Sequence, residues 1–207
     1  MNTPEKMHWE NIYSTKSAGE VSWTQEVPAT SLEFIESFNL KKTDAIIDIG
    51  GGDSKLADHL LEKGFENITV LDISETALNK AKARLGEKAE KIHWVASDIL
   101  NYKPQQRFDF WHDRAAFHFL TSEKQVGEYL SVAEHALSKK GFITIGTFSE
   151  TGPEKCSGLP VKQYSENSLT NQLGKYFKKI KCITEDHITP FLTKQNFLFC
   201  SFRKKAI

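Results

Sequence analysis

Short apolar runs alternate with longer segments of helical periodicity along this chain, beginning near residue 45. The candidate strands are Ala45–Ile49, Ile68–Leu71, Ile92–Ala96, Phe108–His112 and Phe142–Thr147. The segments whose apolar positions recur at helical spacing are Lys55–Lys63, Glu75–Leu85 and Glu123–Leu137. Strands that alternate with helices predict an α/β fold, in which helices cover both faces of a mostly parallel sheet.

The pattern changes after the fifth candidate strand. A polar loop, Gly152–Tyr164, and a short helix, Glu166–Leu173, precede two apolar runs, Phe177–His187 and Asn196–Phe202. Only a turn around Pro190 joins these two runs. Because a parallel connection needs about a dozen residues or more, the two strands must pair antiparallel. The sheet is therefore predicted to end in a C-terminal antiparallel hairpin.

Composition and charge exclude several classes of protein. The 207 residues are 39% hydrophobic and 26% charged, which is ordinary for a globular protein, and no repeat or linker divides them. The 27 basic and 27 acidic residues cancel, so neither a nucleic acid nor an anionic membrane is an expected partner. Without a signal core or an apolar run of roughly 20 residues, we expect a cytoplasmic protein. The three cysteines have no C-x-x-C spacing, so we expect reduced thiols and no metal site.

A glycine-rich turn carries the strongest chemical signal. Gly50, Gly51 and Gly52 follow the first apolar run and precede a helix, and Asp72 closes the next run. Glycines let the backbone approach a ligand closely, and a carboxylate about 20 residues further on can accept hydrogen bonds from ribose hydroxyls. The alternatives are a purely structural turn and an acid at a helix N-terminus, although Ser74 could provide that cap. The pattern favours a cofactor that contains a nucleoside.

The details of the turn argue against a dinucleotide. A dinucleotide site requires a third glycine, where this chain has Ser54. Asp53 would also place negative charge where phosphates bind. S-adenosylmethionine carries no phosphate and presents a cationic sulfonium, so an acidic turn suits it better.

Residues of the first three strand ends resemble motifs of the class I S-adenosylmethionine-dependent methyltransferases, and the resemblance covers about residues 40 to 203. The matching motifs are Asp48-x-Gly50-x-Gly52, Asp72 and Ser97-Asp98-Ile99. The resemblance implies a Rossmann-like seven-stranded sheet with S-adenosyl-L-methionine as cofactor. It also implies that Asp72 binds the ribose, that Asp98 binds the adenine amino group and that Ile99 packs on the ring. The full set of predicted cofactor-binding residues is Tyr13, Trp23, Asp48, Gly50, Gly51, Gly52, Asp72, Ile73, Asp98, Ile99 and His112.

Three ionisable residues follow the fourth candidate strand, at the sheet edge where ligands bind. His112 or Asp113 could remove a proton from a nucleophile, and Arg114 could bind a substrate carboxylate or depress the pKa of a thiol. An Asp113–Arg114 salt bridge that only fixes the loop is the alternative. The Asp113-Arg114-Ala115 element resembles thiopurine S-methyltransferases, whereas an N-P-P-Y-like segment typical of DNA-base methyltransferases is absent.

Large aromatic residues stand out in the polar N-terminal segment. Trp9, Tyr13 and Trp23 resemble the aromatic lead of the methyltransferase-like protein lysine methyltransferases. They could form a lid over the cofactor or pack an N-terminal helix on the sheet. We divide the single domain, residues 1–207, into an N-terminal lid or helix (1–40), a cofactor-binding core (41–150) and a substrate-side insert with the terminal hairpin (151–207).

The sequence therefore predicts methyl transfer from S-adenosylmethionine to a small-molecule nucleophile, namely a thiol, an amine or a carboxylate. A protein lysine methyltransferase is the main alternative. A non-catalytic cofactor-binding module and a nicotinamide-dependent oxidoreductase are weaker alternatives.

Overall fold

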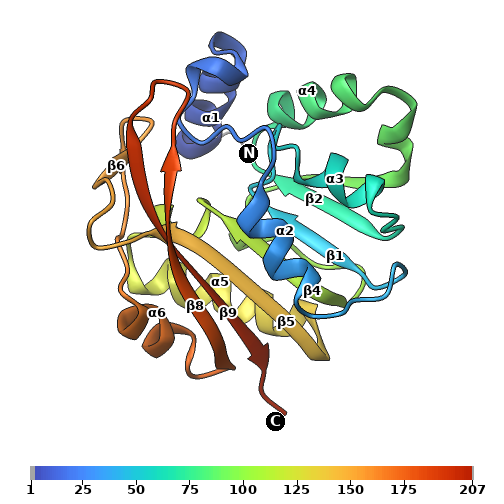
Figure 1. Cartoon of the computed structure of the whole chain (residues 1–207), viewed down its shortest axis with the longest axis vertical. Helices are drawn as coiled ribbons and strands as arrows, with labels where there is room; N and C mark the ends of the chain where they lie inside the picture. The colour runs from blue at the N-terminus through green and yellow to red at the C-terminus, as the bar shows by residue number, and fades with distance from the viewer. Residues whose placement is uncertain (1–2, 207) are drawn as a thin grey trace.

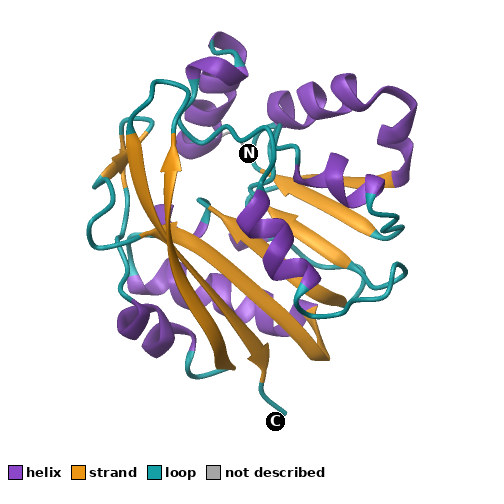
Figure 2. Ribbon diagram, viewed as in Figure 1, coloured by secondary structure: helices purple, strands orange, loops and turns teal. Residues whose placement is uncertain are grey.

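The computed structural model describes residues 3–206 and has seven strands in one sheet, with helices on both faces (Figures 1 and 2). The order of the strands is β3-β2-β1-β4-β5-β9-β8. Their bounds are β1 Ile46–Ile49, β2 Ile68–Asp72, β3 Ile92–Ala96, β4 Phe108–Arg114, β5 Leu137–Phe148, β8 Phe177–Ile188 and β9 Lys194–Lys204. A small separate sheet pairs β6, Lys155–Cys156, with β7, Leu159–Pro160.

The helices lie in the segments between these strands and before the first of them. The α-helices are α1 Pro4–Thr15, α2 Ala29–Glu36, α3 Leu56–Glu62, α4 Glu75–Leu85, α5 Glu123–Ala136 and α6 Glu166–Leu173. Short 3-10 helices are Ala18–Glu20, Gly86–Lys91, Ile99–Asn101 and Phe117–Phe119. No helix within residues 3–206 combines the length and the apolar character that crossing a bilayer requires.

This architecture confirms the predicted fold class. The strand β1 pairs in parallel with both β2 and β4, while β9 pairs antiparallel with both β5 and β8. The chain crosses from β3 at one edge back to β4 beside β1, so the order of strands reverses at β1 and β4. In open α/β sheets, ligands bind beyond the carboxyl ends of the strands at such a reversal.

Alternating side chains of the central strands fill two apolar layers. Ile47 and Trp111 pack with α5 and α6 on one face, whereas Ile46 and Phe110 pack with α2, α3 and α4 on the other. Because both faces are buried, these strands read as continuous apolar runs rather than as alternating patterns. That is why the sequence identified them readily.

Helix caps explain why several helix bounds were predicted well. Ser74 accepts a hydrogen bond from the Ala77 amide at 3.1 Å at the start of α4, and Ser122 forms a capping box with Gln125 at the start of α5. Ser165 caps α6 in the same way. These serines satisfy amides that the helices themselves leave unpaired, so they mark the helix starts.

The structure differs from the sequence prediction at β5 and at two cysteines. The strand β5 starts at Leu137 rather than Phe142, since Leu137 already pairs with Phe108, and an irregularity separates this pair from Phe110–Phe142. Cys182 and Cys200 face each other across β8 and β9, with Cα atoms 4.1 Å apart, and form a disulfide. The expectation of three reduced thiols was therefore wrong for this pair, because sequence spacing does not reveal which strands are neighbours. Cys156 is a free thiol.

Candidate active site

A cavity of about 800 Å³ lies at the carboxyl ends of the parallel strands. The loops after β1 to β4 form its floor, and α1 with the following segment contributes further lining. The predicted site residues that line the cavity are Tyr13, Trp23, Asp48, Gly50, Gly51, Asp72, Ile73, Asp98, Ile99, His112 and Arg114. Gly52 and Asp113 are not among the lining residues.

The glycine turn between β1 and α3 has no room for side chains. Gly50 and Gly52 have φ angles of 63° and 47°, a region that residues with a Cβ rarely adopt. A Cβ on Gly52 would lie 2.7 Å from the Tyr13 hydroxyl and 3.2 Å from a carboxylate oxygen of Asp72. A Cβ on Gly50 would lie 2.7 Å from that of Ala116. The turn thus depends on glycine both for its backbone conformation and for its close neighbours.

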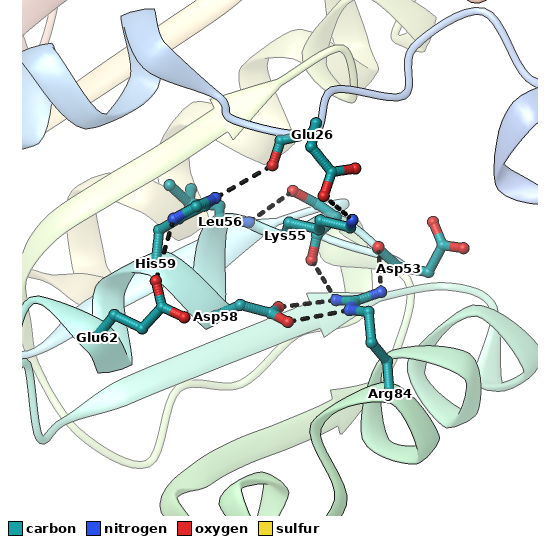
Figure 3. A network of polar contacts seen from close by, with 9 residues as sticks. Glu26, Asp53, Lys55, Leu56, Asp58, His59, Glu62 and Arg84 are labelled. Carbon is teal, nitrogen blue, oxygen red and sulfur yellow. Dashed lines mark hydrogen bonds and ion pairs between the residues drawn. The ribbon is translucent and has the colours of Figure 1, made fainter.

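Arg84 of α4 binds the two residues that follow the glycines of this turn (Figure 3). Its Nη1 donates to the Asp53 carbonyl at 2.7 Å, and its Nη2 donates to the Ser54 carbonyl at 2.9 Å. The same guanidinium binds both carboxylate oxygens of Asp58 on α3, at 3.0 and 2.8 Å. Five donors in a planar fork make this four-bond arrangement possible for arginine and not for lysine. The sequence analysis missed Arg84, because nothing local distinguishes it from other polar positions of α4.

Asp72 places a buried carboxylate at the wall of the cavity. Its Oδ1 accepts a hydrogen bond from the Ser74 amide at 2.8 Å, and the side chain lines the cavity. Burial, together with the carboxylates of Asp48 and Glu10, raises the pKa of Asp72 to about 7, although two backbone hydrogen bonds oppose the shift. Such a group accepts hydroxyl donors strongly, because an ionised carboxylate in a dry site is short of partners.

Asp98 and Ile99 reach the cavity from the loop after β3. Asp98 caps the short helix Ile99–Asn101 by accepting a hydrogen bond from the Leu100 amide at 2.9 Å. Its second oxygen accepts a hydrogen bond from the Asn101 side chain at 3.3 Å. The carboxylate is therefore positioned by its own loop while it lines the cavity.

His112 lies between two polar side chains. Its Nδ1 is 2.7 Å from Asp48 Oδ1, and its Nε2 is 2.9 Å from the Ser31 hydroxyl, which also lines the cavity. Since an Asp48 carboxylate can only accept, the hydrogen-bond network assigns the proton of a neutral ring to Nδ1 and leaves Nε2 as the acceptor for Ser31. Sequence reasoning missed Ser31, because only the packing of α2 on the sheet brings it to His112.

Asp113 faces the other side of β4. Its Oδ1 accepts hydrogen bonds from the amides of Ala116 and Phe117, both at 3.0 Å, and its Oδ2 accepts from the Tyr129 hydroxyl at 2.7 Å. Burial raises its pKa to about 6, although these hydrogen bonds oppose the shift. Asp113 therefore fixes the turn after β4 from within the core, through backbone amides rather than through a salt bridge to Arg114.

Arg114, the next residue of β4, lines the cavity. Its Nη1 donates to the Trp23 carbonyl at 3.0 Å, and its guanidinium lies 4.7 Å from the centre of the Phe197 ring. Burial lowers the pKa of Arg114 to about 10, which still leaves the group cationic at neutral pH. Its Nε and Nη2 are buried and have no hydrogen-bond partner.

The helix α1 lies over the cavity and is attached to α4 through Glu10. The Glu10 carboxylate accepts hydrogen bonds from the amides of Glu75 and Thr76, at 2.8 and 3.2 Å, and from the Ser74 hydroxyl at 3.1 Å. Glu10 thus caps a helix from a distant part of the chain. Partial burial works against the charge, but these hydrogen bonds lower the pKa of Glu10 overall.

Aromatic contacts also join α1 to Trp23 and Phe119, which line the cavity. The Trp9 ring meets the rings of Trp23 and Phe119 edge-on, with centroids 5.7 and 5.1 Å apart. The Tyr13 ring lies 6.1 Å from that of Trp23. These aromatic residues therefore form one layer that closes the cavity on the side of α1.

Comparison with known proteins shows what the chain is similar to. Residues 46–141 match the family described as a methyltransferase domain. The chain is 29% identical to malonyl-[acyl-carrier protein] O-methyltransferase 2 of Ilyobacter polytropus, over 60% of this chain and 49% of that protein. It is 25% identical to EEF1A lysine methyltransferase 2 of Danio rerio, over 68% of this chain and 66% of that protein.

Among solved structures, the chain is similar to the 1,6-didemethyltoxoflavin-N1-methyltransferase of Burkholderia thailandensis, which was solved with its substrate and S-adenosylhomocysteine bound. The TM-score is 0.72 at 18% identity, covering 99% of this chain and 92% of that one. This likeness shows a shared fold. The matches to these two curated relatives span about half and two thirds of their length. The family resemblance that the sequence indicated is thus confirmed.

Removal of the Tyr129 hydroxyl should weaken the core without opening the cavity. Tyr129 accepts a hydrogen bond from Trp111 Nε1 at 2.8 Å and donates to Asp113, so Tyr129→Phe leaves two buried polar atoms without that partner. We expect a loss of about 1–3 kcal/mol in the free energy of unfolding, measured by urea denaturation. Tyr176→Phe, at a half-buried position beside the same core, is the control and should change little. Equal stabilities of the two variants would contradict this role.

Asp72→Asn should stabilise the ligand-free protein above pH 7. Because the folded-state pKa lies above the unfolded value, the stability that Asp72 contributes is present in acid and is lost as the pH rises through about 7. The neutral amide avoids this loss. At pH 8 we expect a gain of about 1 kcal/mol, or roughly 2–4 °C in Tm, which should shrink towards pH 4.5. A lower Tm of the variant at pH 8 would refute the assignment.

Glu10→Ala should release α1. Loss of the shared cap should lower the free energy of local opening by about 1–2 kcal/mol, so amides of Pro4–Thr15 should exchange roughly five- to thirtyfold faster. Hydrogen exchange with mass spectrometry measures this effect. Asn11→Ala, an exposed position on the same helix, is the matched control. Unchanged exchange in Glu10→Ala would show that the aromatic contacts alone hold α1.

Proposed function

We propose that this chain, which belongs to the class I S-adenosylmethionine-dependent methyltransferases, transfers a methyl group to a small-molecule nucleophile such as a thiol, an amine or a carboxylate. The observation that carries the proposal is the cavity of about 800 Å³, which is lined by the glycine turn and by Asp72 and covered by α1. Its volume is typical of small-molecule sites, which measure roughly 300–1,000 Å³. Neither a nucleic acid nor a membrane is part of the proposal.

The residues of the cavity fit S-adenosylmethionine as the cofactor. Gly50 and Gly51 line the cavity without side chains, so a ligand can approach the backbone of the turn closely. The buried Asp72 carboxylate suits a pair of ribose hydroxyls, and Asp98 and Ile99 would hold the adenine. Burial raises the pKa of Asp53, so this carboxylate is already short of solvent, and an adjacent diphosphate would add repulsion. The site therefore suits a nucleoside without phosphates.

When bound, this cofactor supplies an electrophilic methyl group on a cationic sulfonium. The residues of the chain then have three tasks, which are to align the acceptor, to exclude water and to receive any proton that the nucleophile releases. The layer of Trp9, Trp23 and Phe119 would exclude water. The lining residues Cys156, Leu159 and Pro160 would form the wall opposite the glycine turn.

His112 is the proton acceptor in this proposal. Its Nε2 accepts the hydrogen bond of the Ser31 hydroxyl, and both side chains line the cavity. A proton from the nucleophile can therefore pass to Ser31 while the Ser31 proton passes to His112. Asp48 would stabilise the resulting imidazolium through its bond to Nδ1. Asp113 has a positioning role, since it holds the turn that follows Arg114.

A protein lysine methyltransferase is the second candidate. Two observations favour it, namely the similarity to EEF1A lysine methyltransferase 2 and the N-terminal aromatic residues. Against it, α1 is held over the cavity by three hydrogen bonds from α4 to Glu10, which leaves less room for a polypeptide. Incubation of cell extracts with methyl-labelled cofactor, followed by separation by size, distinguishes the two. Label on small molecules supports the first proposal, and label only on proteins supports the second.

Asp72→Ala should weaken binding of S-adenosylhomocysteine by about 1.5–3 kcal/mol, because the ribose would lose charge-assisted hydrogen bonds. Isothermal titration calorimetry measures the change, with NAD as a ligand that should not bind. Asp44→Ala, at the opposite end of β1, should bind as the wild type does. Equal dissociation constants for the two variants would place the ribose elsewhere, and NAD binding in the micromolar range would overturn the choice of cofactor.

A further inference from the structure

We infer that the methyl acceptor carries a carboxylate group and that Arg114 binds it through Nε and Nη2. This inference rests on the proposed function, since it concerns the acceptor half of the same cavity. It goes further by assigning the acceptor a charge and an anchoring residue. The carboxylate is the group that orients the acceptor, whichever of its atoms receives the methyl group.

Two donors of one buried cation lack partners. Nε and Nη2 of Arg114 lie on one edge of the guanidinium and are shielded from solvent, yet neither donates to any described protein atom. A buried charged donor without a partner is costly, and proteins rarely tolerate one unless a ligand completes it. That edge presents two parallel N–H groups, which match the two oxygens of a carboxylate.

The rest of the guanidinium is already held in place. Nη1 donates to the Trp23 carbonyl, and the plane lies over the Phe197 ring. Arg114 is also the last residue of β4, so its backbone belongs to the central sheet. An arginine held in this way loses little conformational freedom when it binds an anion, which favours a role in recognition.

No protein carboxylate takes the free edge within residues 3–206. Glu185 on β8 is the acidic residue with the largest effect on the pKa of Arg114, but it forms no ion pair with Arg114, and one of its own oxygens is buried without a partner. Glu185 therefore acts on Arg114 only at a distance and leaves its donors free.

The position of Arg114 separates it from the predicted nucleoside site. Asp72 ends β2, on one side of β1, whereas Arg114 ends β4, on the other side of β1, and contacts Phe197 of β9. Cys156 and Phe148 belong to the same apolar cluster as Phe197. An acceptor anchored there would lie on the opposite side of the cavity from the ribose.

The surroundings favour a carboxylate over a phosphate. Burial, and secondly the charge of Arg114, lower the pKa of His118 to about 3, and the same two causes lower the pKa of His187. Both rings are thus neutral at pH 7, and Arg114 is the cation of this wall. A single cation among aromatic side chains balances one negative charge, whereas a phosphate dianion requires more.

Binding of a matched pair of small molecules tests the inference. Benzoate and benzamide have nearly the same shape and differ in charge, and ligand-observed NMR titration at millimolar concentration measures both, with and without S-adenosylhomocysteine. We expect the wild type to bind benzoate about tenfold more tightly than benzamide. Arg114→Gln should remove this preference, and Arg114→Lys should retain only part of it, because lysine lacks the planar fork. Arg203→Lys, an exposed position on β9, is the control.

Three outcomes would overturn the inference. Equal binding of the two probes by the wild type would show that no anion site exists. Retention of the preference in Arg114→Gln would place the site elsewhere. A loss of S-adenosylhomocysteine binding in Arg114→Gln, with 5′-methylthioadenosine binding unchanged, would assign Arg114 to the carboxylate of the cofactor instead. Failure of the wild type to bind S-adenosylhomocysteine would count against the proposed function, while the benzoate titration would still report on Arg114.

Discussion

The cavity contains a buried carboxylate that has too few hydrogen-bond donors, and this carboxylate favours a ligand that carries hydroxyl groups. Asp72 ends a central strand and accepts a hydrogen bond from the Ser74 amide, but its environment raises its pKa to about 7. The folded protein tolerates this cost because the glycine turn, the cap of α4 and the position of α1 all converge on the same point. A ligand with two hydroxyl groups would relieve it. The proposed cofactor site is therefore a place where the fold is incomplete without a partner.

Arg114 is likewise buried with too few hydrogen-bond partners, but it is a cation that needs acceptors. One cavity thus has a carboxylate in need of donors at one end and a guanidinium in need of acceptors at the other. Asp72 ends β2 and Arg114 ends β4, on either side of β1 in the sheet. Methyl transfer requires this arrangement, since donor and acceptor must meet in a fixed orientation away from water.

Long-range polar contacts make the N-terminal segment part of the site. Glu10 caps α4, and Glu26 pairs with Lys55 while its carbonyl contacts His59 on α3 (Figure 3). Further along, the Ser22 carbonyl is 2.7 Å from His187 Nε2 on β8. The segment therefore bridges both halves of the sheet, and Figure 1 shows α1 above the carboxyl ends of the strands. Its aromatic residues act as a wall because these polar contacts hold them there.

The sequence by itself determined the fold class, the order of elements, the glycine turn and Asp72, because apolar periodicity, glycine conformation and helix caps are local properties. It also located the three residues at the end of β4, but alternation along the strand divides them: His112 and Arg114 face the cavity, while Asp113 between them faces α5. Only the tertiary structure decided the contacts of Ser31, Arg84 and Glu10 and the pairing of Cys182 with Cys200. Each of these residues contacts its partner only after distant segments pack together. Spacing along the chain therefore does not predict these contacts.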